Sequence, residues 1–194
     1  MKYISDFVRH FGGREVFSIR DARIFLKQKK ISRQYLYFLI HYLQKKGKLR
    51  KIAKGFYSFK DDILVCGFAF SPFYYGLHQA LSFHNVWDQA ANPVIVTQKK
   101  VRPGLRAIMG ANVVVRRVDA GMFFGFELVK HYDFWLPVST PEKTLIDFVY
   151  FRQKIPAGVA GKLLGQSNKK LLAAYLKKSP NWVQKRVKKI AANK

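Results

Sequence analysis

The sequence has few acidic residues, a single cysteine and no long apolar run. Only eleven Asp and Glu stand against thirty-six Lys and Arg in 194 residues. The single cysteine, Cys66, excludes an internal disulfide and a cysteine-based metal cluster, and its apolar neighbours predict a buried core position. No stretch reaches the roughly eighteen apolar residues of a membrane span, and residues 1–11 carry Asp6 and lack the apolar block of a signal peptide. We therefore expect a cytoplasmic protein that does not enter the membrane.

Signatures of common catalytic sites are missing as well. There is no His-x-Glu zinc pattern, no phosphate-binding glycine loop and no Gly-x-Ser-x-Gly elbow. The candidate metal-binding carboxylates in the middle of the chain have no recognised spacing; they include Asp61, Asp62, Asp119, Glu127, Asp133, Glu142 and Asp147. We expect no enzymatic activity, no metal and no cofactor. A metal-dependent nucleic-acid enzyme is kept as a less favoured alternative, which alanine at Asp133 or Asp147 and a metal-requirement assay would test.

The positive charge is concentrated at the two ends of the chain. Residues 1–60 hold sixteen Lys and Arg against three acids, residues 61–150 hold eight against eight, and residues 151–194 hold twelve against none. A neutral middle between two basic ends indicates localised contacts with a polyanion rather than a uniformly basic surface. Nucleic acid is the expected partner. The apolar content of 49% is enough for one good core or two small ones, which excludes a disordered chain.

Residues 1–60 have the periodicity of three helices followed by a hairpin. The predicted helices are 2–11, ended by Gly12 and Gly13; 19–27, with Ser18 and Asp21 in capping-box positions; and 33–46, capped by Ser32 and closed by Gly47. The predicted strands are 49–52 and 56–59, joined by a short turn at residues 53–55. This order is typical of a winged helix-turn-helix, in which the third helix enters the major groove and the hairpin contacts the flanking backbone.

The third helix and the hairpin supply the predicted DNA-binding residues. The apolar stripe Leu36, Leu39, Ile40 and Leu43 is expected to face inward, which leaves the other side of the helix for DNA. The outward helix residues predicted to bind DNA are Arg33, Gln34, Tyr37, His41 and Lys45, with Arg33, Gln34 and Tyr37 reading bases. The residues predicted to hold phosphates are Lys48, Arg50, Lys51 and Lys54, together with Ser32 and the amides at the helix start. Winged helices also serve as protein-docking modules, so a solvated basic face is the alternative.

Residues 61–150 alternate between apolar runs and turn signals. We expect strands at 63–70, 93–97, 113–118, 122–128 and 132–138. Two Ser/Thr-Pro pairs each predict a helix start: Ser71-Pro72 for a helix through Phe83, and Thr140-Pro141 for a helix over 142–151. The second of these helices is expected to bury Leu145 and Ile146 and to expose Glu142 and Lys143.

Three segments of this middle region resemble the AbiEi family of prokaryotic antitoxins and transcriptional regulators. They are Phe70-Ser71-Pro72-Phe73-Tyr74-Tyr75-Gly76-Leu77 followed by Ala80-Leu81, then 94–97, then Ser139-Thr140-Pro141-Glu142-Lys143-Thr144-Leu145-Ile146-Asp147. With the N-terminal helices the resemblance spans about residues 1–150. It implies a winged-helix repressor of its own operon and a second domain that acts as antitoxin against a nucleotidyltransferase-like toxin in a type IV toxin-antitoxin system. Many such chains resemble stand-alone regulators, so a toxin partner is implied less strongly than repression.

Residues 151–194 read as helical pieces broken at Pro156, at Ser167 and at Ser179-Pro180. The last piece carries Trp182, Val183, Val187, Ile190 and Ala191 on one face. Its other positions form a predicted auxiliary basic surface for DNA: Lys185, Arg186, Lys188 and Lys189. An anionic membrane is less favoured because the apolar face is short.

The sequence therefore predicts an α+β protein in three parts. These are a winged helix-turn-helix at residues 1–60, a mixed α/β domain at 61–150 and a basic helical extension at 151–194 packed on the second domain. The expected function is transcriptional repression through double-stranded DNA. A protein-binding antitoxin without DNA specificity is the alternative, and it predicts binding to a toxin but no footprint on DNA.

Overall fold

Helices and strands both contribute to the structure, which confirms the predicted α+β class. The computed structural model describes residues 3–89 and 91–192. The chain divides into two compact units, one formed by residues up to Ser71 with Ala107–Ala111, the other by Pro72–Arg106 and the residues from Asn112 onward. The division predicted at residues 60 and 150 stays a prediction.

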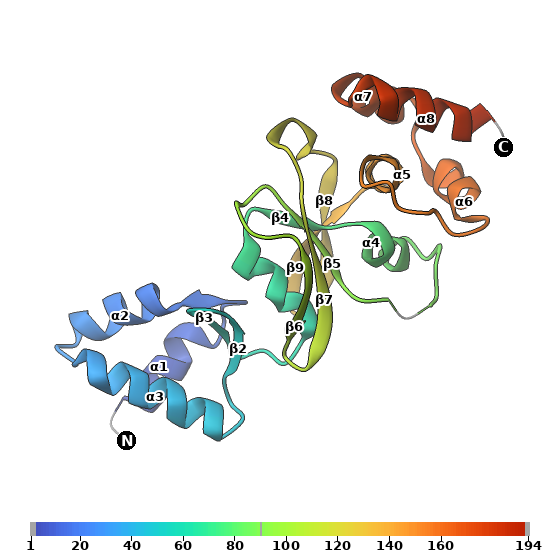
Figure 1. Cartoon of the computed structure of the whole chain (residues 1–194). Coiled ribbons are helices and arrows are strands. Elements are labelled where there is room, and N and C mark those ends of the chain that lie inside the picture. Colours follow the sequence, from blue (N-terminus) through green and yellow to red (C-terminus); the bar gives the residue numbers. More distant parts are fainter. Residues whose placement is uncertain (1–2, 90, 193–194) are drawn as a thin grey trace. The chain divides into compact units, whose positions relative to one another are not determined.

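The first unit contains three helices and a small antiparallel sheet (Figure 1). Its elements are α1 (Ile4–Phe11), β1 (Phe17–Ser18), α2 (Ile19–Gln28), α3 (Arg33–Lys45), β2 (Arg50–Ala53), β3 (Phe56–Ser58) and the 3-10 helix η1 (Ile63–Phe70). The strand order is β1-β3-β2, with Phe17 opposite Tyr57 and Arg50 opposite Ser58. These elements follow the predicted order of helices and hairpin. Lys2, at the predicted start of the first helix, lies outside the described residues.

Local sequence signals account for the helix ends in this unit. The Ser18 hydroxyl accepts a hydrogen bond from the Asp21 amide at 3.1 Å, and the Asp21 carboxylate accepts one from the Ser18 amide at 3.0 Å. This reciprocal pair is the predicted capping box, and it satisfies backbone donors that the first helical turn leaves free. The core beneath the helices is aromatic, with the Phe11 and Phe17 rings stacked 4.4 Å apart.

The second unit is built on a six-stranded sheet, of which residues 107–111 are grouped with the first unit, and its other α-helices pack around helix α5. The strands are β4 (Phe73–Tyr75), β5 (Val94–Thr97), β6 (Gly104–Ile108), β7 (Ala111–Arg117), β8 (Phe126–His131) and β9 (Phe134–Ser139). The helices are α4 (Leu77–Phe83), η2 (Ala120–Met122), α5 (Pro141–Tyr150), α6 (Val159–Gln166), α7 (Lys169–Lys178) and α8 (Asn181–Ala192). The strand order is β6-β7-β5-β4-β9-β8.

Strand directions in this sheet are mixed. β4 runs antiparallel to β5, with Tyr74 opposite Val96, and parallel to β9. β5 runs parallel to β7, and β8 and β9 form an antiparallel hairpin. Helix α5 packs against α4, α6, α7 and α8, so the three helices of the basic C-terminal segment gather around it (Figure 1).

Two predicted elements in the middle region are wrong. Residues 63–70 form the 3-10 helix η1 rather than a strand, because the Asp62 carboxylate caps it at the Leu64 amide (2.7 Å) and an all-apolar run does not distinguish a strand from a buried helix. Ser71 does not open a helix; its hydroxyl donates to the Phe68 carbonyl at 3.1 Å and so closes η1. The aromatic residues 73–75 then pair as strand β4, consistent with their strand propensity, and α4 starts only at Leu77.

One strand of this unit was not predicted, and another begins later than predicted. Strand β6 was not predicted, because glycines such as Gly104 at its start and Gly110 just after it are more typical of loops than of strands. Met109 and Gly110 have positive φ values of 53° and 80°, the geometry of the two-residue hairpin turn between β6 and β7. The strand predicted at 122–128 begins at Phe126, because residues 120–122 form η2.

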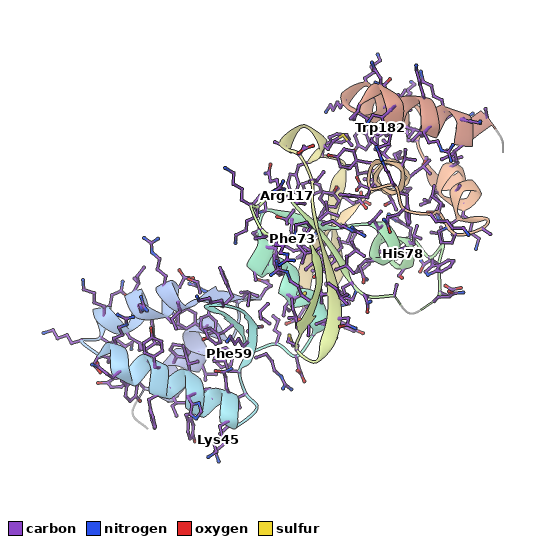
Figure 2. The ribbon with its side chains drawn as sticks, viewed as in Figure 1. Lys45, Phe59, Phe73, His78, Arg117 and Trp182 are labelled. Atoms are coloured by element: carbon purple, nitrogen blue, oxygen red, sulfur yellow. The ribbon has the colours of Figure 1, made fainter. Side chains whose placement is uncertain are left out.

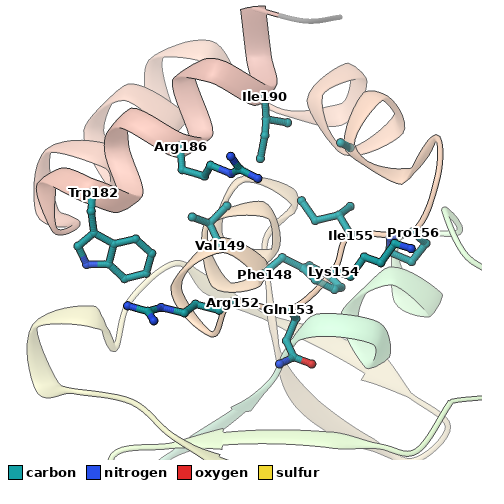
Figure 3. Close-up of a pocket in the computed structure, with 11 residues that line it drawn as sticks. Phe148, Val149, Arg152, Gln153, Lys154, Ile155, Pro156, Trp182, Arg186 and Ile190 are labelled. Atoms are coloured by element: carbon teal, nitrogen blue, oxygen red, sulfur yellow. The ribbon is translucent and has the colours of Figure 1, made fainter.

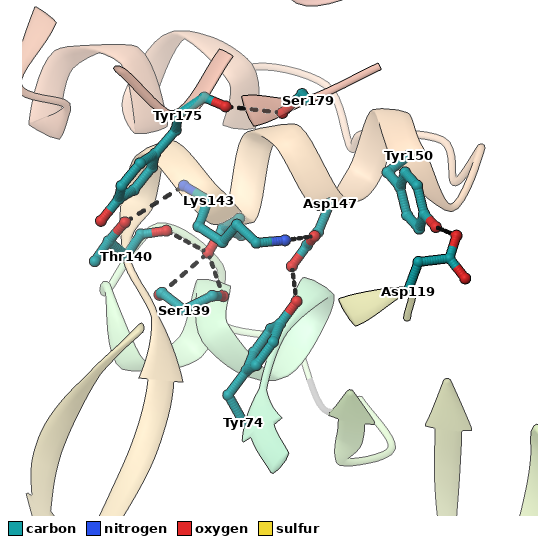
Figure 4. A network of polar contacts seen from close by, with 10 residues as sticks. Tyr74, Asp119, Ser139, Thr140, Lys143, Asp147, Tyr150, Tyr175 and Ser179 are labelled. Carbon is teal, nitrogen blue, oxygen red and sulfur yellow. Dashed lines mark hydrogen bonds and ion pairs between the residues drawn. The ribbon is translucent and has the colours of Figure 1, made fainter. Parts of the chain in front are cut away.

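The expected exposure of Glu142 and Lys143 is wrong, because Tyr74 of β4 and Phe124 lie over Lys143 and the start of α7 lies beside Glu142. Lys143 is fully buried and forms an ion pair with buried Asp147, which also accepts a hydrogen bond from the Tyr74 hydroxyl at 2.8 Å (Figure 4). Burial raises the pKa of the Asp147 carboxyl, and Lys143 and Tyr74 oppose that shift. The Glu142 carboxylate accepts a hydrogen bond from the Asn168 amide at 2.6 Å, beside the start of α7. The segment with the family resemblance is thus part of the folded core.

Within residues 3–89 and 91–192, no helix is both long enough and apolar enough to cross a membrane. In the same residues, no group of three or more His, Cys, Asp and Glu side chains has an arrangement that could hold a metal ion.

Candidate nucleic-acid interface

Helix α3 is held with one face in the core and the other in solvent. Ser32 caps its start, where the hydroxyl accepts a hydrogen bond from the Tyr35 amide at 3.3 Å. The four predicted core residues of the helix are all buried: Leu36, Leu39, Ile40 and Leu43. The five outward residues are all exposed: Arg33, Gln34, Tyr37, His41 and Lys45. Lys45 projects from the end of the helix away from the other elements of the unit (Figure 2). The helix therefore presents its predicted DNA-binding residues together on one surface.

Two arginines position Tyr37 on this surface. The guanidinium of Arg23, on α2, donates to the Tyr37 hydroxyl at 2.7 Å, and that of Arg33 donates to it at 3.2 Å. These hydrogen bonds, led by that from Arg33, lower the pKa of the Tyr37 phenol. The two arginines thus converge on one aromatic ring at the start of α3. The sequence prediction missed Arg23; its basic side chain on the solvent side of α2 was the available signal.

A small cavity lies beside the same end of α3. Its volume is about 220 Å³, and its lining combines Arg23, Lys27, Ser32 and Arg33 with the apolar side chains Leu26, Ile31 and Leu36. Three cations and a helix N-terminus at one place suit an anion such as a DNA phosphate, because the free amides of the first turn and the helix dipole both favour negative charge.

Phe38 is a second residue that the sequence prediction missed. Its ring is 52% exposed on α3, and the rings of Tyr35 and Tyr42 lie 6.3 and 6.5 Å from it. An exposed phenylalanine on a solvated helix face leaves apolar surface in water. The periodicity of the helix was the available signal, since position 38 falls outside its apolar stripe.

The hairpin β2–β3 presents further cations. Lys48, Arg50, Lys51 and Lys54 are all exposed. The Gly55 carbonyl accepts a hydrogen bond from the Ile19 amide at 2.8 Å, which fixes the hairpin turn against the start of α2. Gly55 has a φ of 77°, so the turn needs glycine there.

One of these cations already has a protein partner. The Arg50 guanidinium donates to the Asp61 carboxylate at 2.8 Å, and both side chains are largely exposed. The sequence has twelve Lys and Arg and no acidic residue between Asp21 and Asp61, and one of these cations, Lys29, forms an ion pair with Asp6 at 2.7 Å. The potential of this surface is accordingly positive.

The auxiliary basic residues of α8 do not all have the same surroundings. Val183 and Val187 are buried, and Lys185, Arg186, Lys188 and Lys189 are exposed on the same helix. Arg186 differs from the three lysines because it lines a cavity between α8 and the end of α5. The predicted surface therefore consists of three exposed lysines, whereas Arg186 lines the cavity between α8 and α5.

Comparisons with known proteins show what parts of the chain are similar to. Residues 8–60 match the family model described as "Transcriptional regulator, AbiEi antitoxin". No curated protein matches the chain. A crystal structure of the RV2827C protein from Mycobacterium tuberculosis is similar, with a TM-score of 0.62 and 16% sequence identity over 98% of this chain and 76% of that one. At this identity the likeness concerns the fold alone. The match over residues 8–60 confirms, for this part of the chain, the predicted similarity to the AbiEi family of antitoxins and transcriptional regulators; the segments 70–81, 94–97 and 139–147 lie outside the matched residues.

Proposed function

We propose that the chain is a sequence-specific repressor that binds double-stranded DNA upstream of its own gene, with α3 in the major groove. The observation that carries the proposal is the exposed face of α3, where Arg33, Gln34 and Tyr37 stand together without an acidic neighbour on the helix. Arg pairs with the guanine edge and Gln with the adenine edge, so this face has the donors and acceptors for base reading.

We assign the contacts with the DNA backbone to the residues around α3. Lys48, Lys51 and Lys54 of the hairpin and the cavity at the start of α3 would hold phosphates on either side of the groove. Phe38 would lie against the groove, where an exposed ring favours the methyl group of thymine. His41 and Lys45 would reach the neighbouring backbone.

A reporter assay in cells tests repression directly. The region upstream of the gene is fused to a reporter, and the chain is supplied from a second plasmid. We expect the native chain to lower reporter output and Arg33→Ala to lose most of that effect. Lys130→Gln, which removes one positive charge from an exposed position on β8, is the matched control and should repress normally. Equal repression by Arg33→Ala and the native chain, at equal protein levels, would contradict base reading by α3.

The family description favours a second role as an antitoxin. We propose that the second unit neutralises a toxin, and the sequence resemblance implies a nucleotidyltransferase-like enzyme encoded beside it. Co-expression tests this role: residues from 72 onward should restore growth in cells that produce the neighbouring gene product. If growth is not restored by this part or by the full chain, the protein is a regulator without a toxin partner.

A further inference from the structure

A cavity of about 750 Å³ opens between the C-terminal end of α5, the following loop, α6 and α8. Its apolar lining includes Phe148 and Val149 of α5, Ile155 of the loop and Ile190 of α8. Figure 3 shows Trp182, Arg186 and Ile190 projecting from α8 toward Val149 and Ile155. All of these residues belong to the second unit.

The rim of the cavity is cationic. Among the described residues that line it, Arg152, Lys154 and Arg186 are positively charged and none is acidic. The Arg152 guanidinium lies 5.5 Å from the centre of the Trp182 ring, whose exposure is 44%. A guanidinium against an indole keeps its charge while covering apolar surface, so the rim offers a positive group beside an aromatic wall.

The size and shape of the cavity fit a small molecule better than DNA. Its volume lies within the roughly 300–1,000 Å³ of sites for small ligands, and its lining is apolar with a few polar groups, as such sites usually are. A DNA duplex presents its phosphates on a stiff, convex surface that cannot enter a hollow of this size. The exposed lysines of α8 can contact such a surface, but the apolar residues that line the cavity cannot.

We propose that this cavity binds a small amphiphilic anion, a molecule with one carboxylate, sulfonate or phosphate group and an aromatic or acyl body. The anionic group pairs with Arg186, the guanidinium of Arg152 on Trp182 adds positive charge at the rim, and the apolar body lies against Ile155 and Ile190. The ligand thereby joins α5 to α8. Arg186, predicted from the sequence to contact DNA, serves this site instead.

Two fluorescent probes that differ in charge test the proposal. Anilinonaphthalene sulfonate has an aromatic body and one negative charge, and N-phenylnaphthylamine has almost the same body without the charge. Titration of the full chain should give one saturable site for the sulfonate, with an affinity at least about tenfold higher than for the neutral probe, the effect of a charge-assisted hydrogen bond. Equal affinities would overturn the proposal, because they would indicate a merely apolar surface.

Substitutions locate the site. Arg152→Gln with Arg186→Gln should weaken sulfonate binding about tenfold or more and leave the neutral probe unchanged. Lys185→Gln with Lys189→Gln removes the same charge from positions of α8 outside the cavity lining and should change neither affinity. If both double variants lose affinity alike, general electrostatic attraction explains the binding and the site is refuted. Circular dichroism and the unfolding midpoint establish that each variant is folded.

Ala160→Phe provides a second test, because it fills the cavity from α6 and keeps all three cations. It should abolish saturable binding of the sulfonate probe. Unchanged binding would place the probe elsewhere and overturn the proposal. A DNA duplex added to the probe complex should not displace the probe; displacement that depends on Arg152 and Arg186 would assign the cavity to DNA and refute a small-molecule site.

Discussion

At the scale of single residues, Arg33 is the side chain on which the proposed reading of DNA bases depends most. It stands in the first turn of α3 and hydrogen-bonds Tyr37, so its guanidinium is held on the exposed face of the helix. Replacement by alanine should cost about 1–3 kcal/mol of binding free energy at the preferred site and much less on random duplex. Fluorescence anisotropy titrations on the two duplexes measure this difference.

Lys54→Ala is the comparison for Arg33→Ala. Lys54 is exposed at the turn of the hairpin, where a cation can reach phosphates but not base edges. Its loss should weaken binding to preferred and random duplex about equally and reduce the salt slope by about one. Equal losses on the two duplexes for Arg33→Ala as well would remove Arg33 from base readout.

Asp61 restrains one of the predicted phosphate contacts. Its carboxylate accepts a hydrogen bond from Arg50, so part of the charge of Arg50 is neutralised before DNA arrives. Asp61→Asn should therefore raise the affinity for any duplex by a few-fold, with the larger gain at low salt. Asp88→Asn removes one negative charge from an exposed position in the second unit and is the control. The same gain in both variants would show that only net charge matters.

Replacing only one partner of the buried ion pair Lys143–Asp147 should greatly lower the free energy of unfolding. Lys143→Met leaves the Asp147 carboxylate buried without its cation, and such changes cost about 3–5 kcal/mol. Lys143→Met with Asp147→Leu leaves no buried charge, although the Tyr74 hydroxyl loses its acceptor, so its cost should be smaller. Urea unfolding of the three proteins measures the free energies. A double variant as unstable as the single one would contradict this view of the pair.

At the scale of the elements, helices and strands that depend on nearby residues were predicted more accurately than those that depend on residues far along the chain. The helices of the first unit were predicted because their signals are local: the box formed by Ser18 and Asp21, the cap at Ser32, and Gly47 with a φ of 66°. Periodicity likewise predicted the exposed face of α3. Such signals lie within a few residues of the element that they define.

Elements that depend on distant partners were predicted poorly. Strand β4 exists because it pairs with β5 and β9, which lie far along the chain, and a Ser-Pro pair before it suggested a helix. Lys143 appeared exposed because an amphipathic helix has a solvent side when considered alone. Helices α4, α6, α7 and α8 surround α5, and no pattern within residues 140–150 predicts that packing. Arg23 was missed for the same reason, since its partner Tyr37 belongs to another helix.

A hydrogen bond between Tyr150 of α5 and Asp119, which precedes η2, should make the stability of the second unit fall at alkaline pH. Burial, together with the hydrogen bond that the Tyr150 hydroxyl donates to Asp119 at 2.7 Å, raises the pKa of Tyr150 to about 12 from an ordinary value of 10.0 (Figure 4). The folded state therefore holds this proton more tightly than the unfolded state. The resulting stability is complete below pH 10 and is lost as the pH rises toward 12.

Unfolding free energies measured from pH 9 to 12 check this expectation. The native chain should lose more stability than Tyr150→Phe over the upper part of this range, because the variant has no proton to lose at that position. Parallel curves for the two proteins would show that Tyr150 does not contribute.

At the scale of the whole molecule, the charge distribution separates two kinds of surface. The first unit combines an acid-free stretch between Asp21 and Asp61 with an exposed helix face, whereas residues 151–194 combine twelve Lys and Arg with most of the lining of a largely apolar cavity. The former arrangement suits a long polyanion read along a groove, and the latter suits a small anion held in a hollow. The chain would thus carry a DNA-reading module and a ligand-binding module in separate units.

Binding of the purified full chain to DNA tests sequence-specific recognition most directly. Anisotropy titrations compare the region upstream of its gene with a shuffled duplex of the same length and composition, at two salt concentrations. We predict affinity for the upstream region about a thousandfold or more above that for the shuffled duplex, with a marked loss on both at higher salt. Equal affinity for the two duplexes at both salt concentrations would contradict a sequence-reading repressor.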